Sequence, residues 1–139
     1  MILLDTNVVF EPLRQRPEPR VIAWIDAQPL ETLYLSAITV AELRAGVAML
    51  PAGKRRSTLQ ESLEKRVIPL FAGRVLPFDQ ACTQAYAQLV AKARAAGSVI
   101  APADGYIAAI AATNGFEVAT RDTQPFTAAG ISVINPWQV

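Results

Sequence analysis

The sequence predicts an α/β domain with a central, mostly parallel sheet of five strands and helices on both of its faces. Short apolar runs rich in β-branched residues alternate along the chain with longer segments of helical period. Parallel strands need crossover connections, and this alternation provides them. The chain has 139 residues and contains no internal repeat, linker or low-complexity tract. We therefore expect residues 1–139 to form a single domain.

The first two strands flank a short helix. Met1–Leu4 is an apolar run that predicts the first strand. Val21–Ala27 predicts a helix that packs Ile22 and Ile25 inward and ends before the next proline. Leu33–Leu35 predicts the second strand.

Two helices and the third strand follow in the middle of the chain. Ser36 and Thr39 can both cap a helix that runs to about Leu50. Lys54–Ile68 is amphipathic and predicts the next helix. Arg74–Leu76 predicts a short third strand that ends at a proline.

The last part of the chain repeats the alternation of helix and strand. Asp79 is placed to cap an alanine-rich helix over about Gln80–Ala96. Pro102 opens another helix, because proline is favoured at the first helical position. Phe116–Thr120 and Ile131–Ile134 then predict the fourth and fifth strands.

The composition limits the chemistry available to this protein. The sequence has no histidine, which excludes the commonest general base, the usual zinc ligand and every catalytic triad that needs histidine. Cys82 is the only cysteine, so an intramolecular disulfide and a thiolate metal site are excluded, and we expect it to be a small core residue. The net charge of +1 neither requires nor excludes a polyanionic substrate. Any catalysis must therefore use carboxylates, hydroxyls, Lys, Arg, Tyr or a metal held by oxygen.

The high apolar content predicts a protein partner or an oligomer. Hydrophobic residues make up 52% of the chain and charged residues 18%, so we expect some apolar surface to meet another chain. Asp104 interrupts the most hydrophobic stretch, and no membrane span is expected. The N-terminal run lacks the basic segment of a signal peptide, which predicts a cytoplasmic protein.

Four acidic residues are predicted to meet at one edge of the sheet. Asp5 directly follows the first strand and Asp122 follows the fourth in Thr120-Arg121-Asp122, at the carboxyl ends where open α/β sheets bind ligands. Asp104 lies in the first turn of the helix before the fourth strand, and Glu42 lies one turn into the helix after the second. Carboxylates about 4 Å apart repel by about 4 kcal/mol at an effective dielectric of about 20, so a divalent cation or an arginine must compensate them. Because all available ligands are oxygens, Mg²⁺ or Mn²⁺ fits best, and such ions hydrolyse phosphodiesters.

Each acid also has a purely structural interpretation. Glu42 completes a capping box with Thr39, in which its side chain would bind the Thr39 backbone N–H. Asp104 in a first helical turn can simply complement the helix dipole. Asp5 and Asp122 can cap a following helix or form an Asx turn. The functional interpretation therefore depends on the four acids sharing one edge, and not on any one of them.

Five short motifs span nearly the whole chain. They are Met-Ile-Leu-Leu-Asp-Thr-Asn at 1–7, Leu-Ser-Ala-Ile-Thr-Val-Ala-Glu-Leu at 35–43, Ala-Asp-Gly-Tyr-Ile-Ala-Ala at 103–109, Ala-Thr-Arg-Asp at 119–122 and Asn-Pro-Trp at 135–137. In this order and spacing the sequence resembles the PIN-domain family and, within it, the VapC-type toxins of the FitB-like branch. The resemblance implies a catalytic quartet with three metal ligands and two supporting hydroxyls. The quartet is Asp5, Glu42, Asp104 and Asp122, the metal ligands are Asp5, Asp104 and Asp122, with Asp5 and Asp104 leading, and the hydroxyls belong to Thr6 and Thr120.

The same resemblance implies an activity and a set of partners. It implies hydrolysis of RNA with one or two Mg²⁺ ions, for which Mn²⁺ can substitute, through in-line attack of an activated water. The products would carry 5′-phosphate and 3′-hydroxyl ends. It also implies a homodimer and a cognate antitoxin that inserts a basic side chain into the acidic pocket. Operator DNA is expected to bind only through the antitoxin, because this chain has no visible DNA-reading module.

Three other protein classes are alternatives to this interpretation. A receiver domain needs adjacent acids after the first strand and a lysine after the fifth, whereas Asp5 stands alone and the only lysines are Lys54, Lys65 and Lys92. An Asp-x-Asp phosphatase is disfavoured because position 7 is Asn7. A non-catalytic partner subunit of a DNA-binding regulator, whose acidic edge docks a basic side chain, stays open as the alternative.

Several basic and aromatic residues have less specific interpretations. Lys54-Arg55-Arg56, at a helix start, can contact RNA phosphates, although a charged helix end is usually just solvated. Trp24 and Trp137 are expected to be packing residues rather than base-stacking platforms. Three further cations can line the substrate path, namely Arg14, Arg16 and Arg20.

Overall fold

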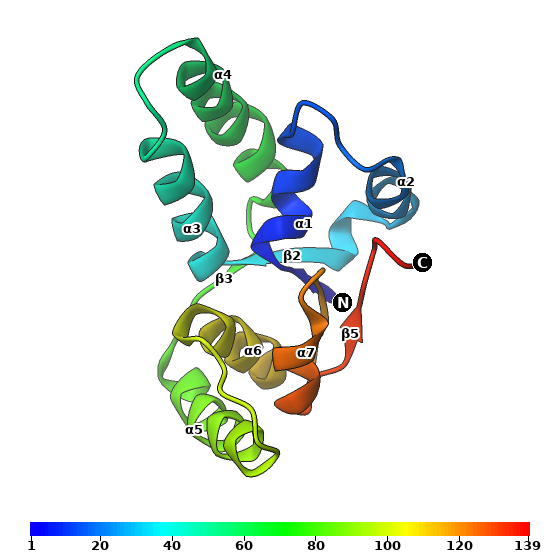
Figure 1. The fold of residues 1–139 in the computed structure, drawn as a ribbon, viewed down its shortest axis with the longest axis vertical. Coiled ribbons are helices and arrows are strands. Elements are labelled where there is room, and N and C mark those ends of the chain that lie inside the picture. The colour runs from blue at the N-terminus through cyan, green and yellow to red at the C-terminus, as the bar shows by residue number, and fades with distance from the viewer.

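A five-stranded sheet lies at the centre of the computed structural model, which describes residues 1–139 (Figure 1). The strand order is β3-β2-β1-β4-β5, and every neighbouring pair is parallel. The strands are β1 (Ile2–Leu4), β2 (Leu33–Ser36), β3 (Val75–Leu76), β4 (Glu117–Ala119) and β5 (Val133–Ile134). The predicted α/β class and the five predicted strands are confirmed.

The strand order reverses between β1 and β4. The chain passes from β1 to β2 and β3 on one side, and then returns to β4 on the other side of β1. Leu3 of β1 pairs with Tyr34 of β2 and with Val118 of β4. Such a reversal opens a crevice beyond the carboxyl ends of the two strands, because their crossover connections leave in opposite directions. Asp5, the residue after β1, lies at this crevice.

Helices cover both faces of the sheet, as predicted. They are α1 (Thr6–Phe10), α2 (Pro19–Ala27), α3 (Ala37–Ala48), α4 (Lys54–Ser62), α5 (Gln80–Ala95), α6 (Pro102–Asn114) and α7 (Thr123–Ala128). In Figure 1, α1, α3 and α4 lie on one side of the sheet, and α5, α6 and α7 lie on the other. Leu3 packs in the hydrophobic cluster with α5 and α6, and Leu4 packs in the cluster with α1 and α3. Successive strand residues point to opposite faces, so β1 contributes to both clusters.

Two predicted helix caps are confirmed. The Ser36 hydroxyl accepts a hydrogen bond from the Thr39 backbone N–H at 2.9 Å and begins α3. The Asp79 carboxylate accepts one from the Cys82 N–H at 3.2 Å and begins α5. Cys82 itself is a buried core residue, as expected. These caps satisfy N–H groups that a helix start leaves without partners.

The prediction of one helix over Lys54–Ile68 is wrong at its C-terminal end. The helix α4 ends at Ser62, and the chain continues as a π-helical turn over Leu63–Val67. Pro69 explains the change, because proline has no N–H to donate and its ring clashes with the carbonyl four residues earlier. A short 3₁₀ helix over Ile68–Phe71 then leads to β3.

Two short helices were not predicted from the sequence. The helix α1 has 5 residues and α7 has 6, which is too short for a helical period to be visible. Each of them begins at the residue after an acid that follows a strand, namely Asp5 after β1 and Asp122 after β4. A 3₁₀ turn, η1 (Glu11–Leu13), extends α1. No helix is long and apolar enough to cross a membrane.

Candidate active site

Asp5 is buried at the end of β1, and its carboxylate is fixed by two hydrogen bonds. Its backbone N–H donates to the Ala119 carbonyl at 2.9 Å, which keeps the residue in register with β4. One carboxylate oxygen accepts from the Thr6 N–H at 2.8 Å, and the other accepts from the Thr120 hydroxyl at 2.7 Å. Burial raises the pKa of the Asp5 carboxyl above its ordinary value of 3.8, and the hydrogen bonds from Thr120 and Thr6 oppose that rise.

Asp104 lies in the first turn of α6 and is half-buried beside the crevice. Burial, together with the negative charges of Asp5, Asp122 and Glu42, raises the pKa of its carboxyl to about 6. The four carboxylates therefore repel one another across one site. Asp104 makes no side-chain hydrogen bond within the protein, so this carboxylate is free to bind a ligand.

Glu42 reaches the site from α3 through a contact with α1. The Thr6 hydroxyl donates to the Glu42 carboxylate at 2.6 Å, although the two residues are 36 positions apart in the sequence. The Thr6 hydroxyl is also 3.4 Å from that of Thr39. The capping-box interpretation of Glu42 is wrong, because Ser36 caps α3 and already binds the Thr39 N–H.

Thr120 joins Asp5 to the loop that carries Asp122. Its buried hydroxyl donates to Asp5 and accepts a hydrogen bond from the Asp122 backbone N–H at 3.1 Å. Asp122 occupies the N-cap position of α7, but its carboxylate makes no capping bond and stays exposed. The Arg121 N–H donates to the Asn7 side-chain oxygen at 3.4 Å, which ties this loop to α1.

These residues line one pocket of about 340 Å³. The lining consists of all four predicted acids together with Thr6, Asn7 and Phe10, and it contains no Lys or Arg. Asn7 and Phe10 were not predicted to be site residues, and the only sequence signal was their closeness to Asp5 along the chain. Residues three apart share a helical face, so the unpredicted α1 brings both to the pocket.

The donor set suits a hard divalent cation that keeps part of its water shell. No group of three acidic side chains stands close enough to hold an ion by itself. Mg²⁺, however, is commonly bound by one or two carboxylates and several waters. The all-oxygen lining and the mutual repulsion at Asp104 fit such an ion. The predicted metal ligands Asp5, Asp104 and Asp122 all line this pocket, but they do not form a preassembled site of three carboxylates.

The predicted arginines and tryptophans lie outside this pocket. Arg14 forms an ion pair with the buried Glu11 at 2.9 Å, and Arg20 donates to the Trp137 carbonyl at 2.9 Å. Trp24 and Trp137 pack against the core, as expected for packing residues. The Arg121 guanidinium lies over the Trp137 ring, 5.3 Å from the ring centre. Arg14 and Arg20 therefore have structural partners in this chain.

The fold and this acidic pocket define a PIN domain. The PIN-domain family model matches residues 2–131, and the chain belongs to that family. It is similar to the VapC ribonuclease Y4jK of Sinorhizobium fredii, with 61% identity over 138 residues covering 99% of each chain. It is also similar to the toxin FitB of Neisseria gonorrhoeae, with 58% identity over 137 residues and 99% of each chain. A solved structure of FitAB bound to an IR36 DNA fragment matches with a TM-score of 0.97 and 55% identity, covering 100% of this chain and 97% of that chain.

Proposed function

We propose that this protein is a Mg²⁺-dependent endoribonuclease and the toxin of a toxin–antitoxin pair. The observation that carries the proposal is a pocket in which four carboxylates meet at the switch point of a parallel sheet with no cation among them. Such a cluster is costly unless it binds a positive group. The names of two relatives, a VapC ribonuclease and the toxin FitB, support the reaction and the role.

In this proposal Asp5, Asp104 and Asp122 hold Mg²⁺, and Mn²⁺ can take its place. The bound ion supplies an acidified water and offsets negative charge on the phosphate. Thr120 and the Thr6 N–H keep the Asp5 carboxylate in one orientation, so that less reorganisation is needed when a ligand binds.

Glu42 is the candidate general base. One of its oxygens accepts the Thr6 hydroxyl at 2.6 Å, while the exposed carboxylate keeps a second oxygen for the proton of an attacking water. In-line attack by that water would form a bond between its oxygen and phosphorus and break the bond between phosphorus and the 3′ oxygen, which would take up a proton from solvent. The products are a 5′-phosphate end and a 3′-hydroxyl end.

The partners belong to the same proposal. An acidic pocket without its own cation is complementary to a basic side chain, which a cognate antitoxin would insert to block the metal site. We place operator-DNA binding in the antitoxin and the whole pair in the cytoplasm. The structure of FitAB on DNA supports a complex of this kind.

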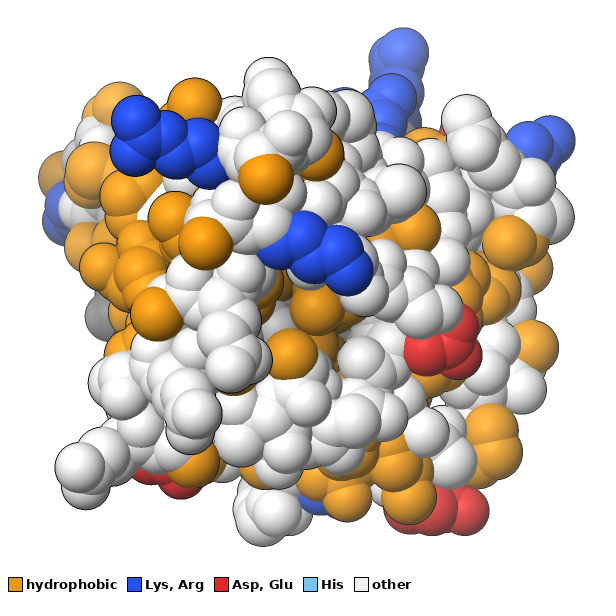
Figure 2. All heavy atoms as spheres, turned by 90° about the horizontal axis from the view of Figure 1, so that it is seen from below, with side chains coloured by type: hydrophobic (Ala, Val, Ile, Leu, Met, Phe, Trp, Pro, Cys, Tyr) orange, Lys and Arg blue, Asp and Glu red, His pale blue; other side chains and the backbone are white.

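A homodimer is also part of the proposal. Figure 2 shows the face that carries α5 and α7, where hydrophobic side chains gather toward one side among scattered charges. Val99, in the turn between α5 and α6, is 92% exposed. A second copy of the chain would remove such apolar surface from water.

The test is cleavage of total RNA by the antitoxin-free protein, with 5′-end sequencing of the fragments. We expect cleavage with Mg²⁺, none with EDTA, and none from Asp5→Asn. Asp26→Asn is the matched control, because Asp26 is exposed on α2 and outside the pocket. Folded protein that cleaves no RNA with any divalent metal would instead support the non-catalytic subunit that docks a basic side chain.

A further inference from the structure

A basic basin lies between η1 and α4, next to the acidic pocket. It has a volume of about 670 Å³. The cations that line it are Lys54, Arg55 and Arg66, and no Asp or Glu lines it. The remaining lining is Pro12, Leu13, Gln15, Thr58, Leu59 and Ser62. Amide and hydroxyl groups therefore accompany three positive charges in one hollow.

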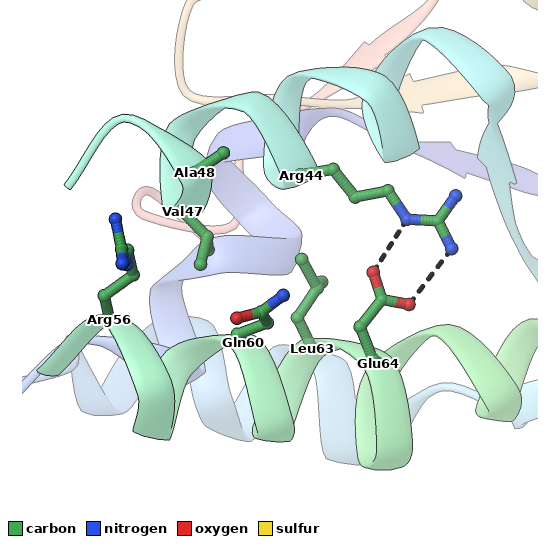
Figure 3. A pocket seen from close by; sticks show the side chains of 7 residues that line it. All are labelled: Arg44, Val47, Ala48, Arg56, Gln60, Leu63 and Glu64. Carbon is green, nitrogen blue, oxygen red and sulfur yellow. Dashed lines mark hydrogen bonds and ion pairs between the residues drawn. The ribbon is translucent and has the colours of Figure 1, made fainter. Parts of the chain in front are cut away.

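The three cations of the basic basin have no partner within the protein. The ion pairs of this chain join Arg14 to Glu11, Arg44 to Glu64 and Lys65 to Glu61. Figure 3 shows the contrast in the pocket on the other side of α4, where the Arg44 guanidinium faces Glu64 with bonds of 2.7 and 3.0 Å. The basic basin thus concentrates unneutralised charge on a chain whose net charge is only +1.

Helix stability does not explain Lys54 and Arg55. Lys54 and Arg55 occupy the first turn of α4, where the helix dipole is positive and no acidic residue is present. Positive side chains are unfavourable at that end of a helix. Along the helix, the residues of the basin recur every four positions, from Lys54 through Thr58 to Ser62, so they share one face.

A narrow cleft connects the basic basin to the acidic pocket. It has a volume of about 210 Å³ and shares Arg55 and Leu59 with the basin. It shares Thr6, Phe10 and Glu42 with the acidic pocket. One continuous depression therefore runs from the four carboxylates, past an aromatic ring, to the three cations.

We propose that the basic basin binds the phosphate backbone of the RNA strand on one side of the scissile phosphate, with the strand crossing Phe10 to reach the acidic pocket. This inference rests on the proposed nuclease function. Carboxylates alone repel a polyanion, so an RNA strand that reaches them needs positive charge close by. A narrow depression with an aromatic ring accommodates an unpaired strand, whose bases can stack on such rings. The three cations of the basic basin favour a polyanion over an apolar peptide segment there, whereas the connecting cleft is lined mainly by apolar side chains.

The test uses RNA binding in a protein that does not cut. In the Asp5→Asn background, anisotropy of a labelled single-stranded RNA of about 20 nucleotides reports the dissociation constant as salt is varied. The variant Lys54→Gln/Arg55→Gln/Arg66→Gln should bind about 10–100-fold more weakly near 0.1 M salt. Its plot of log affinity against log salt should be shallower by about 2, since each lost phosphate contact contributes about 0.7 for single strands.

The matched control removes three cations elsewhere, as Lys65→Gln/Lys92→Gln/Arg94→Gln, and should keep the original slope. None of these residues lines the basic basin. The basin variant should melt at the same or a higher temperature, because two of its cations oppose the helix dipole.

Unchanged RNA affinity and slope in the basin variant would overturn the inference, and so would a variant that loses only binding of a protein partner. Failure of the nuclease proposal looks different. Wild-type protein would then bind RNA through the basin without cutting it. Conversely, suppose that the wild-type protein cleaves RNA and that the basin variant, with Asp5 restored, has an unchanged KM. This result would reject RNA binding by the basic basin and would leave the nuclease proposal standing.

Discussion

The substitution Asp104→Asn should stabilise the metal-free protein at neutral pH. The pKa of Asp104 is about 6 in the folded protein against an ordinary value of 3.8, so its charged form is disfavoured by burial and by three neighbouring carboxylates. A pKa rise of this size corresponds to a cost of about 3 kcal/mol for the charged carboxylate in the folded state, before solvent screening is taken into account. Solvent screening at this half-exposed side chain reduces it to about 1 kcal/mol, or about 3 °C in melting temperature.

The sign of the effect depends on pH. A folded pKa above the unfolded one means that the folded state binds more protons between about pH 4 and 6, so stability falls as the pH rises through that window. Asparagine cannot ionise and avoids the penalty. The advantage of the variant should therefore be present at pH 7.5 and disappear below about pH 4.

Thermal unfolding of both proteins with EDTA, and again with Mg²⁺, checks the reasoning. Mg²⁺ should stabilise the wild-type protein and have less effect on Asp104→Asn, because a ligand stabilises only the state that binds it. Asp26→Asn, an exposed change on α2, should leave the melting temperature within error at both pH values. A variant that is less stable than wild type at pH 7.5 without metal would show that the carboxylates do not repel one another as inferred.

The remaining predictions concern hydroxyl groups and one glycine. Thr120→Val removes the hydrogen bonds to Asp5 and to the Asp122 N–H. It should lower the free energy of unfolding in urea by about 1–3 kcal/mol and lower kcat for RNA cleavage. Thr120→Ser keeps the hydroxyl and should restore both values. Thr6→Val removes the hydrogen bond to Glu42 and should lower kcat more than stability, and an unchanged kcat would show that the Thr6 hydroxyl does not position Glu42. Ser36→Ala should cost about 1 kcal/mol through loss of the α3 cap, whereas the exposed Ser57→Ala should cost little. Gly115→Ala should cost about 1 kcal/mol, since Gly115 ends α6 at a φ of +70°, and a neutral result would argue against that backbone.

Much of the fold could be predicted because its signals are local. Apolar runs such as Met1–Leu4 and caps such as Ser36 and Asp79 act over a few residues, and the structure contains the elements that they predict. The short helix α1 gave no periodic signal, and neither did the π-helical turn over Leu63–Val67. The five residues of α1 are too few to show a helical period, whereas the end of α4 could have been predicted from Pro69.

For the candidate site, the sequence determined which acids follow a strand or lie near a helix start. The alternation of strands and helices predicts a parallel sheet, and the carboxyl ends of parallel strands lie at one edge. Only the tertiary structure decided that Thr6 reaches Glu42, that Thr120 orients Asp5, and that no Lys or Arg side chain lines the pocket. The same holds for the basic basin, which forms only because α4 packs beside α1 and η1. These contacts join residues far apart in the chain, so they depend on the packing of helices across the sheet rather than on any pattern that a short segment carries.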